Sequence, residues 1–100
     1  MRHPDWNTLV RIIDREIVSR YGGKIHDPRC GKTWDPGQAV CAEMYGPDWN
    51  TDPRFLAVNT AHESESPPRE MLFAAHRLAD GECDWAEEGA GRRAEKEAGR

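Results

Sequence analysis

Glycine and proline interrupt this 100-residue chain often enough that it can build only short helices. Gly22-Gly23, Gly46-Pro47 and Gly81 each follow a stretch with apolar residues at helical spacing, and each is a typical helix end. Glycine ends a helix because it adopts the left-handed conformation readily, and proline because it has no backbone N–H to donate. We therefore expect a small all-α fold, a single domain with helices at residues 6–21, 36–45, 53–61 and 67–80.

Aspartate followed by proline predicts where the two middle helices begin. Asp35-Pro36 places a capping carboxylate before a proline that suits the first helical turn, and Gln38 completes a capping box. Asp52-Pro53 repeats the arrangement without the glutamine. We expect both aspartates to cap the free N–H groups of the helices that follow them.

The first and last expected helices have the clearest apolar stripes. Asp5 is the expected cap of the first helix, and Ser66 that of the last, with Pro67-Pro68 in its first turn. The buried face of the first helix should consist of Trp6, Leu9, Val10, Ile13, Ile17 and Val18. The buried face of the last should consist of Met71, Leu72, Ala75, Leu78 and Ala79.

The pentapeptide Pro-Asp-Trp-Asn-Thr occurs twice, at residues 4–8 and 47–51. In the first copy the helix is expected to start directly, so that Trp6 packs into the core. In the second copy Pro53 follows too closely for a helix that starts at Trp49, because a proline ring inside a helix clashes with the preceding turn. Trp49 is therefore expected in a turn before the third helix. Of the two tryptophans in the repeat, we expect Trp49 rather than Trp6 to face a binding partner.

The segment at residues 22–35 is expected to be an irregular loop. Pro28 disfavours a helical conformation for the residue before it, and Gly31 weakens any strand. The alternative for this segment is a short β-hairpin around residues 24–34.

The end of the chain differs from the rest in composition. From residue 86 onward it has no apolar residue larger than alanine, so it cannot bury a face against a core. We expect the domain to span residues 1–85 and residues 86–100 to form a charged, disordered tail.

The overall composition limits the classes of function. Apolar residues make up 37%, enough for one modest core but too few for a core that also encloses a deep substrate cavity. The chain has no apolar run long enough for a transmembrane helix, and its first residues lack the apolar segment of a signal peptide. Three cysteines, an odd number, argue against a disulfide framework. These features predict a cytoplasmic protein.

Charge is distributed unevenly along the chain, which carries a formal net charge of -4. Residues 1–34 hold seven Lys or Arg against four Asp or Glu, whereas residues 35–88 hold three against twelve. So acidic a middle segment repels phosphate backbones and attracts basic surfaces. We therefore expect a larger protein partner with a basic surface, and no direct binding to nucleic acid or membrane.

Every tryptophan is adjacent to an aspartate, and three of the four fall outside the middle of an expected helix. Tryptophan dominates the binding energy of many protein interfaces, so exposed tryptophans beside carboxylates are candidate anchors. The expected partner-binding residues are Trp34, Trp49, Trp85, Glu63, Glu65, Asp84, Glu87 and Glu88.

Metal binding and catalysis have weaker support in the sequence. His26, Cys30, Cys41 and Cys83 are the set from which a zinc site would be drawn, but no Cys-x-x-Cys pair is present. Nor does any cysteine–histidine or carboxylate pair come with a third orienting residue at a recognisable spacing. We expect no cofactor, no metal and no catalytic residues, with free buried cysteines instead.

These observations together predict a non-enzymatic, intracellular protein-binding module that inhibits or regulates a larger partner. One concrete version is a phage- or mobile-element-encoded inhibitor of a nucleic-acid-handling defence complex, of the anti-CRISPR type, in which acidic side chains compete for a basic channel. The alternatives are a small DNA-binding regulator that uses the basic first helix and the 24–32 loop, and a small zinc-stabilised module.

Overall fold

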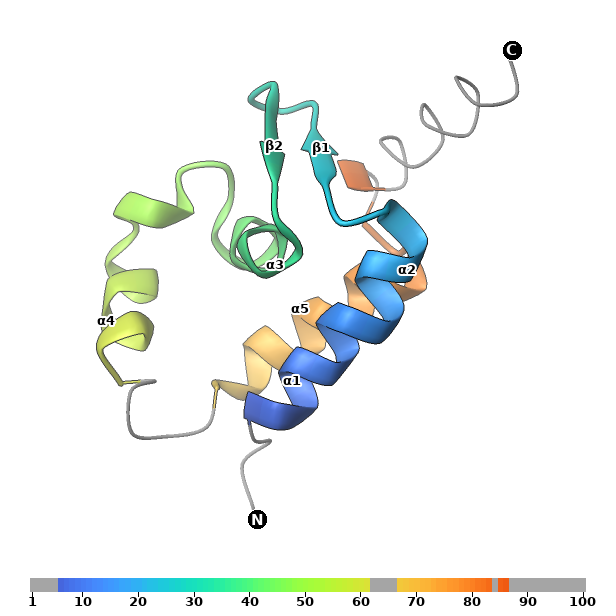
Figure 1. The fold of residues 1–100 in the computed structure, drawn as a ribbon. Coiled ribbons are helices and arrows are strands. Elements are labelled where there is room, and N and C mark those ends of the chain that lie inside the picture. The colour runs from blue at the N-terminus through green and yellow to red at the C-terminus, as the bar shows by residue number, and fades with distance from the viewer. Residues whose placement is uncertain (1–5, 62–66, 84, 87–100) are drawn as a thin grey trace, which may run out of the picture.

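The structure is a computed structural model that describes residues 6–61, 67–83 and 85–86. Its described part is an all-α fold with one short hairpin, as expected from the sequence (Figure 1). The elements in chain order are α1 (Trp6–Ile12), a π-helical turn η1 (Ile13–Ile17), α2 (Val18–Tyr21), β1 (Ile25–Asp27), β2 (Lys32–Trp34), α3 (Pro36–Tyr45), a 3₁₀ turn η2 (Trp49–Thr51), α4 (Pro53–Ala61) and α5 (Arg69–Asp80).

The capping signals of the two middle helices are confirmed. In α3 the backbone N–H of Asp35 donates to the side-chain oxygen of Gln38 over 3.1 Å, as part of a capping box. In α4 the carboxylate of Asp52 accepts a hydrogen bond from the backbone N–H of Arg54 over 2.8 Å. Trp49 lies in η2, ahead of α4, as the position of Pro53 predicted.

The first helix is continuous over residues 6–21 but is not uniform, because η1 is a π-helical turn between α1 and α2. Its buried residues Leu9, Ile17 and Tyr21, together with the half-buried Ile13, are spaced four apart. In a regular α-helix this spacing drifts around the axis, since one turn takes 3.6 residues. The wider π turn holds more residues. It therefore keeps these side chains on one face, toward α5.

The last helix begins later than expected. α5 starts at Arg69, and Pro68 is its extended N-cap residue, with φ -59° and ψ 149°. Pro67 also stays outside the helix, because the residue before a proline is driven away from helical geometry. Its side chain is buried instead. The predicted caps Asp5 and Ser66 lie outside the described residues.

Residues 25–34 form the β-hairpin that was the alternative to an irregular loop. Its strands are antiparallel, with Ile25 opposite Trp34 and Asp27 opposite Lys32. Gly31 supplies the positive φ of 74° in the turn between them. The side chains of Ile25, Asp27 and Trp34 are buried, so one face of the hairpin rests on the helices.

Three helical segments carry the core. α3 packs along α5, and α5 packs along α1 and η1, while the hairpin lies over the beginning of α3 (Figure 1). The hydroxyl of Tyr21 donates to the carbonyl of Leu78 over 3.3 Å and ties the end of the first helix to α5. The short helix α4 packs mainly against η2 and α3.

The position of α4 leaves part of the expected core uncovered. Val10, predicted on the buried face of the first helix, is 48% exposed, and Trp6 is only half-buried. Both residues lie on the side of α1 that faces α4, where they line a hollow between the two helices. Because α4 is held by η2 and α3, it does not close over them.

The order of burial among the tryptophans is the reverse of the prediction. Trp49 is 9% exposed and Trp34 is 8% exposed, so both are more buried than Trp6. The turn at η2 directs Trp49 inward, where its ring meets Trp34 edge to face at 5.7 Å between centroids and Phe55 at 4.8 Å. The expectation that Trp49 faces outward is therefore wrong.

The described chain extends slightly past the predicted domain end. Ala86 is fully buried in the same core, one residue beyond the boundary at residue 85. The expected disordered tail otherwise lies outside the described residues. Of the helices that the structure describes, none is both long and apolar enough to cross a lipid bilayer.

Candidate functional site

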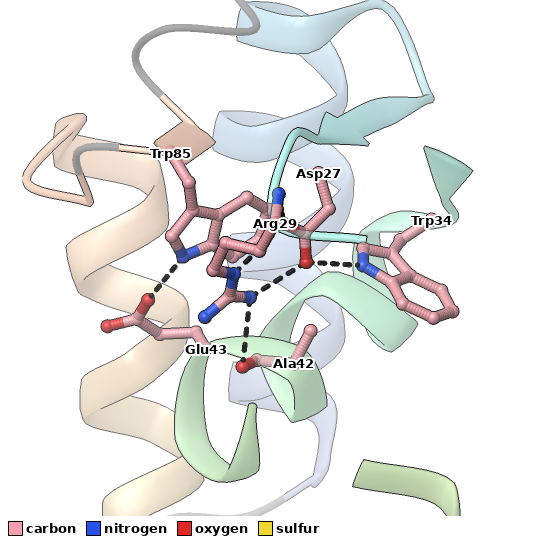
Figure 2. A network of polar contacts seen from close by, with 6 residues as sticks. All are labelled: Asp27, Arg29, Trp34, Ala42, Glu43 and Trp85. Carbon is pink, nitrogen blue, oxygen red and sulfur yellow. Dashed lines mark hydrogen bonds and ion pairs between the residues drawn. The ribbon is translucent and has the colours of Figure 1, made fainter. Parts of the chain in front are cut away.

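A network of polar contacts joins the hairpin to the helices, with the carboxylate of Asp27 at its centre (Figure 2). Asp27 is fully buried. It accepts hydrogen bonds from Arg29 Nε over 2.9 Å and Arg29 Nη2 over 2.8 Å, and another from the indole N–H of Trp34 over 3.0 Å. The backbone N–H of Arg29 adds a fourth donor over 3.0 Å.

These donors determine what Asp27 can do chemically. Burial alone raises the pKa of its carboxyl, but the hydrogen bonds from Arg29 and Trp34 outweigh it and hold the pKa below the ordinary value. A carboxylate with this many donors is a poor proton acceptor. Asp27 therefore serves to hold the hairpin on the helices.

Arg29 carries the network onward to α3 and to the end of α5. Its Nη2 also donates to the carbonyl of Ala42 over 3.3 Å, and its guanidinium lies 4.4 Å from the centroid of the Trp85 ring. The indole N–H of Trp85 donates to one oxygen of Glu43 over 3.2 Å, while Nε of Arg77 lies 3.1 Å from the other (Figure 2 shows all but Arg77). The network thus joins the hairpin, α3, α5 and Trp85.

An apolar groove lies between α1 and α4, on the side that α4 leaves open. It is a hollow of about 210 Å³ with a floor formed by α3 and Met71. Its first wall carries Trp6, Leu9 and Val10 of α1 and Ile13 of η1, and its α4 wall carries Phe55, Val58 and Asn59. None of its described lining residues carries a formal charge.

A second hollow, of about 490 Å³, adjoins the first at Val58, which lines both. It lies between α4, the end of α3 and the first half of α5. Apolar and charged side chains alternate in it: Met44, Tyr45, Arg54, Pro68, Glu70, Phe73 and Arg77. Phe73 is the most exposed of its apolar residues, at 52%. We call the two hollows together the α4 groove.

The three predicted partner-binding residues that the structure describes are not gathered on one exposed surface. Trp34 and Trp49 are core residues, and Trp85 is a half-buried member of the polar network. The five predicted carboxylates, Glu63, Glu65, Asp84, Glu87 and Glu88, lie outside the described residues.

The groove residues were missed as a site because their sequence pattern is that of a core stripe. Val10 and Ile13 were assigned to the buried face of the first helix, and Val58 falls inside an unremarkable short helix. Only the packing of α4 against η2, which depends on contacts between distant residues, leaves them accessible.

The cysteines of the set from which a zinc site would be drawn lie in different environments. Cys30 is exposed, whereas burial raises the pKa of Cys41 to about 11 and, with a hydrogen bond to Glu43, that of Cys83 to about 12. Within residues 6–61, 67–83 and 85–86, no three His, Cys, Asp or Glu side chains come together as a metal site.

The basic residues of the alternative nucleic-acid surface are partly engaged with carboxylates. Lys24 pairs with Asp35, and Arg29 with the buried Asp27. Arg11 on α1 and Arg15 on η1 are exposed. DNA binding through the first helix stays a prediction from the sequence.

Comparison of this chain with protein-family models, with curated proteins and with solved structures found no match. The assignment of a functional site therefore depends on the geometry of the described residues, and the α4 groove is the best-formed candidate.

Proposed function

We propose that the protein is a non-enzymatic protein-binding module that inhibits or regulates a larger partner, and that the α4 groove is its contact surface. The observation that carries this proposal is the uncharged apolar hollow between α1 and α4, with Val10 48% exposed at its edge. Accessible apolar grooves bordered by polar surface are typical of protein interaction sites. The groove replaces the tryptophan-bearing surface as the proposed anchor.

The lining favours binding over catalysis. Among the described residues that line the groove between α1 and α4 there is no carboxylate, imidazole or amine, and the thiol of Cys41 has a pKa of about 11. Acid–base or nucleophilic chemistry needs a group that changes charge near neutral pH. A surface of this composition gains free energy mainly by excluding water from an apolar partner.

The spacing of the wall residues suits a helical partner segment. Val10 on α1 and Ile13 at the start of η1 are three residues apart, and so are Phe55 and Val58 on α4. Residues at this spacing share one helix face. A helix laid between two such walls contacts both rows, which is the helix-in-groove mode of recognition.

The narrower hypothesis, a phage- or mobile-element-encoded inhibitor of a nucleic-acid-handling complex, has support only from the acidity and the size of the chain. The described residues from Asp35 to Ala86 include seven Asp or Glu against three Lys or Arg. A surface of that sign suits a basic partner.

Site-specific cross-linking in the source cells tests the proposal. A photo-cross-linking amino acid is placed at Val10 in the groove or, as a control, at Ser19, which is exposed on α2. The partner captured through position 10 is then purified and titrated with the wild-type, Val10→Asp and Ser19→Asp chains. We expect capture from position 10 and not from position 19, and a loss of about tenfold or more in affinity for Val10→Asp alone.

Two results would contradict the proposal. One is that position 10 captures no protein, and the other is that Val10→Asp and Ser19→Asp bind the captured protein as tightly as wild type. Val10 is already half-exposed, so its substitution by aspartate should leave the fold intact, which the thermal unfolding of the variant checks.

A further inference from the structure

The charges in the second hollow of the α4 groove are unbalanced. Arg54 pairs with Asp52 over 2.8 Å, and Arg77 pairs with Glu43 over 3.1 Å. Glu70, by contrast, has no ion-pair partner in the part of the chain that the structure describes. The two arginines that line the hollow are therefore each paired with a carboxylate, and among its described lining residues Glu70 is the charged side chain without an ion pair.

Apolar surface for a long basic side chain lies next to this carboxylate. Phe73 is three residues after Glu70 on α5, hence on the same face of the helix, and its ring is 52% exposed. Met44 and Tyr45 line the same hollow. A lysine or arginine from a partner can lay its methylene groups along this surface while its charged end reaches Glu70. The Phe73 ring also attracts a cation placed over its face.

The two hollows meet at one residue of α4, Val58, which lines both of them. A single segment that follows α4 therefore contacts the uncharged apolar part first and the Glu70 part next. The first part accepts aliphatic or aromatic side chains, and the second accepts a basic one. A bound segment therefore needs apolar side chains at one end and a basic side chain at the other.

We infer that the segment bound in the α4 groove is an amphipathic helix whose apolar stripe is bordered by lysine or arginine, with one basic residue paired to Glu70. This inference rests on the proposed function and specifies its partner. Aliphatic residues of the helix pack between Val10 and Val58, and the basic residue on its border lies between Glu70 and Phe73. The pairing fixes the direction in which the helix lies along α4.

Two synthetic helices test the inference directly. Both are about 15 residues long, near the lower limit for stable helices in water, and both carry the same leucine stripe. One has lysine on the borders of the stripe and the other has glutamate. Each is titrated into the wild-type, Glu70→Gln and Glu82→Gln chains, with fluorescence anisotropy as the readout. Glu82 is exposed and does not line the groove, so its variant controls for the loss of one negative charge.

We expect the lysine helix to bind wild type at least about tenfold more tightly than the glutamate helix. Glu70→Gln should weaken the lysine helix about threefold to tenfold, and Glu82→Gln less than twofold. The inference is overturned if the two carboxylate variants act alike, if the two helices bind equally, or if neither helix binds wild type.

The outcomes separate this inference from the proposed function. If both helices bind equally and Val10→Asp weakens both, the apolar groove remains the contact surface while the basic partner is rejected. If cross-linking from position 10 captures no protein, the proposed function fails whatever the helices do.

Discussion

The guanidinium of Arg29 lies 4.4 Å from the centroid of the Trp85 ring and at the same time pairs with the buried carboxylate of Asp27. The side chain of Arg29, in the hairpin turn, thus links Trp85, which follows α5, to the hairpin. Glu43 completes the arrangement, since it accepts the indole N–H of Trp85. The hairpin and the end of the described chain are in this way coupled through α3.

Removal of the Arg29 side chain should therefore be costly. Arg29→Ala leaves the Asp27 carboxylate buried without its cation, and we expect the free energy of unfolding to fall by about 2 to 3 kcal/mol. The expected loss is below that of a fully buried pair because the Arg29 side chain is 34% exposed. Urea unfolding measures it. Lys32→Ala, in the same hairpin, should cost less than about 0.5 kcal/mol, and equal losses for the two variants would contradict the role assigned to Arg29.

Stability should also fall in acid for a reason that can be traced to Asp27. Its pKa in the folded state is below the ordinary 3.8, so the unfolded chain takes up a proton at a higher pH than the folded one does. The stabilisation is complete well above about pH 4 and is lost as the pH falls toward the folded value. In Asp27→Asn the decline of the free energy of unfolding below about pH 4 should be shallower than in wild type. Parallel curves for the two chains would refute this assignment.

The three cysteines should differ sharply in reactivity. Cys41 and Cys83, with pKa values of about 11 and 12 and exposures of 8% and 5%, should not react with a thiol reagent at pH 8 while the chain is folded. Cys30 is exposed and should react at once. We expect one thiol per chain to be labelled in the native state and three in urea. Rapid labelling of more than one native thiol would show that the core opens near α3 or the end of α5.

Asp48, inside the second copy of the repeated pentapeptide, and Asp52, directly after it, form a matched pair. The carboxylate of Asp52 accepts the N–H of Arg54 at the start of α4, whereas Asp48 makes no side-chain capping bond. We expect Asp52→Ala to lower the free energy of unfolding by about 1 kcal/mol, and Asp48→Ala to lower it by less than about 0.5 kcal/mol. The reverse order would mean that the helix begins within the repeat.

Local signals in the sequence were sufficient to predict the limits of α3 and α4. The boundaries of α3 and α4 follow from Asp35-Pro36, Asp52-Pro53 and Gly46 because capping depends on residues close together in the chain. The start of α5 was predicted two residues too early. A single proline fits the first turn of a helix, but Pro68 also drives the residue before it, Pro67, away from helical geometry. The π turn in the first helix was not predicted, because no proline, glycine or capping residue marks it in the sequence.

The site depended on contacts between residues far apart in the chain. Trp49 and Phe55 meet Trp34 from a separate element, so the burial of the tryptophans could not be read from their adjacent aspartates. For the same reason Val10 was assigned to the core, although α4 does not cover it. Arg29 is only two residues from Asp27 in the sequence, but the burial of Asp27 depends on the pairing of the two strands, which also brings Trp34 to it.

The central claim is that the α4 groove is the surface that binds a protein partner. Methyl NMR of the chain, recorded as the protein captured by cross-linking is added, tests it most directly. We expect the methyl signals of Val10, Ile13 and Val58 to shift or broaden, while those of Val18 on α2 and Ile25 in the hairpin stay in place. Binding that moves the Val18 and Ile25 signals and leaves Val10 and Val58 unchanged would contradict the claim.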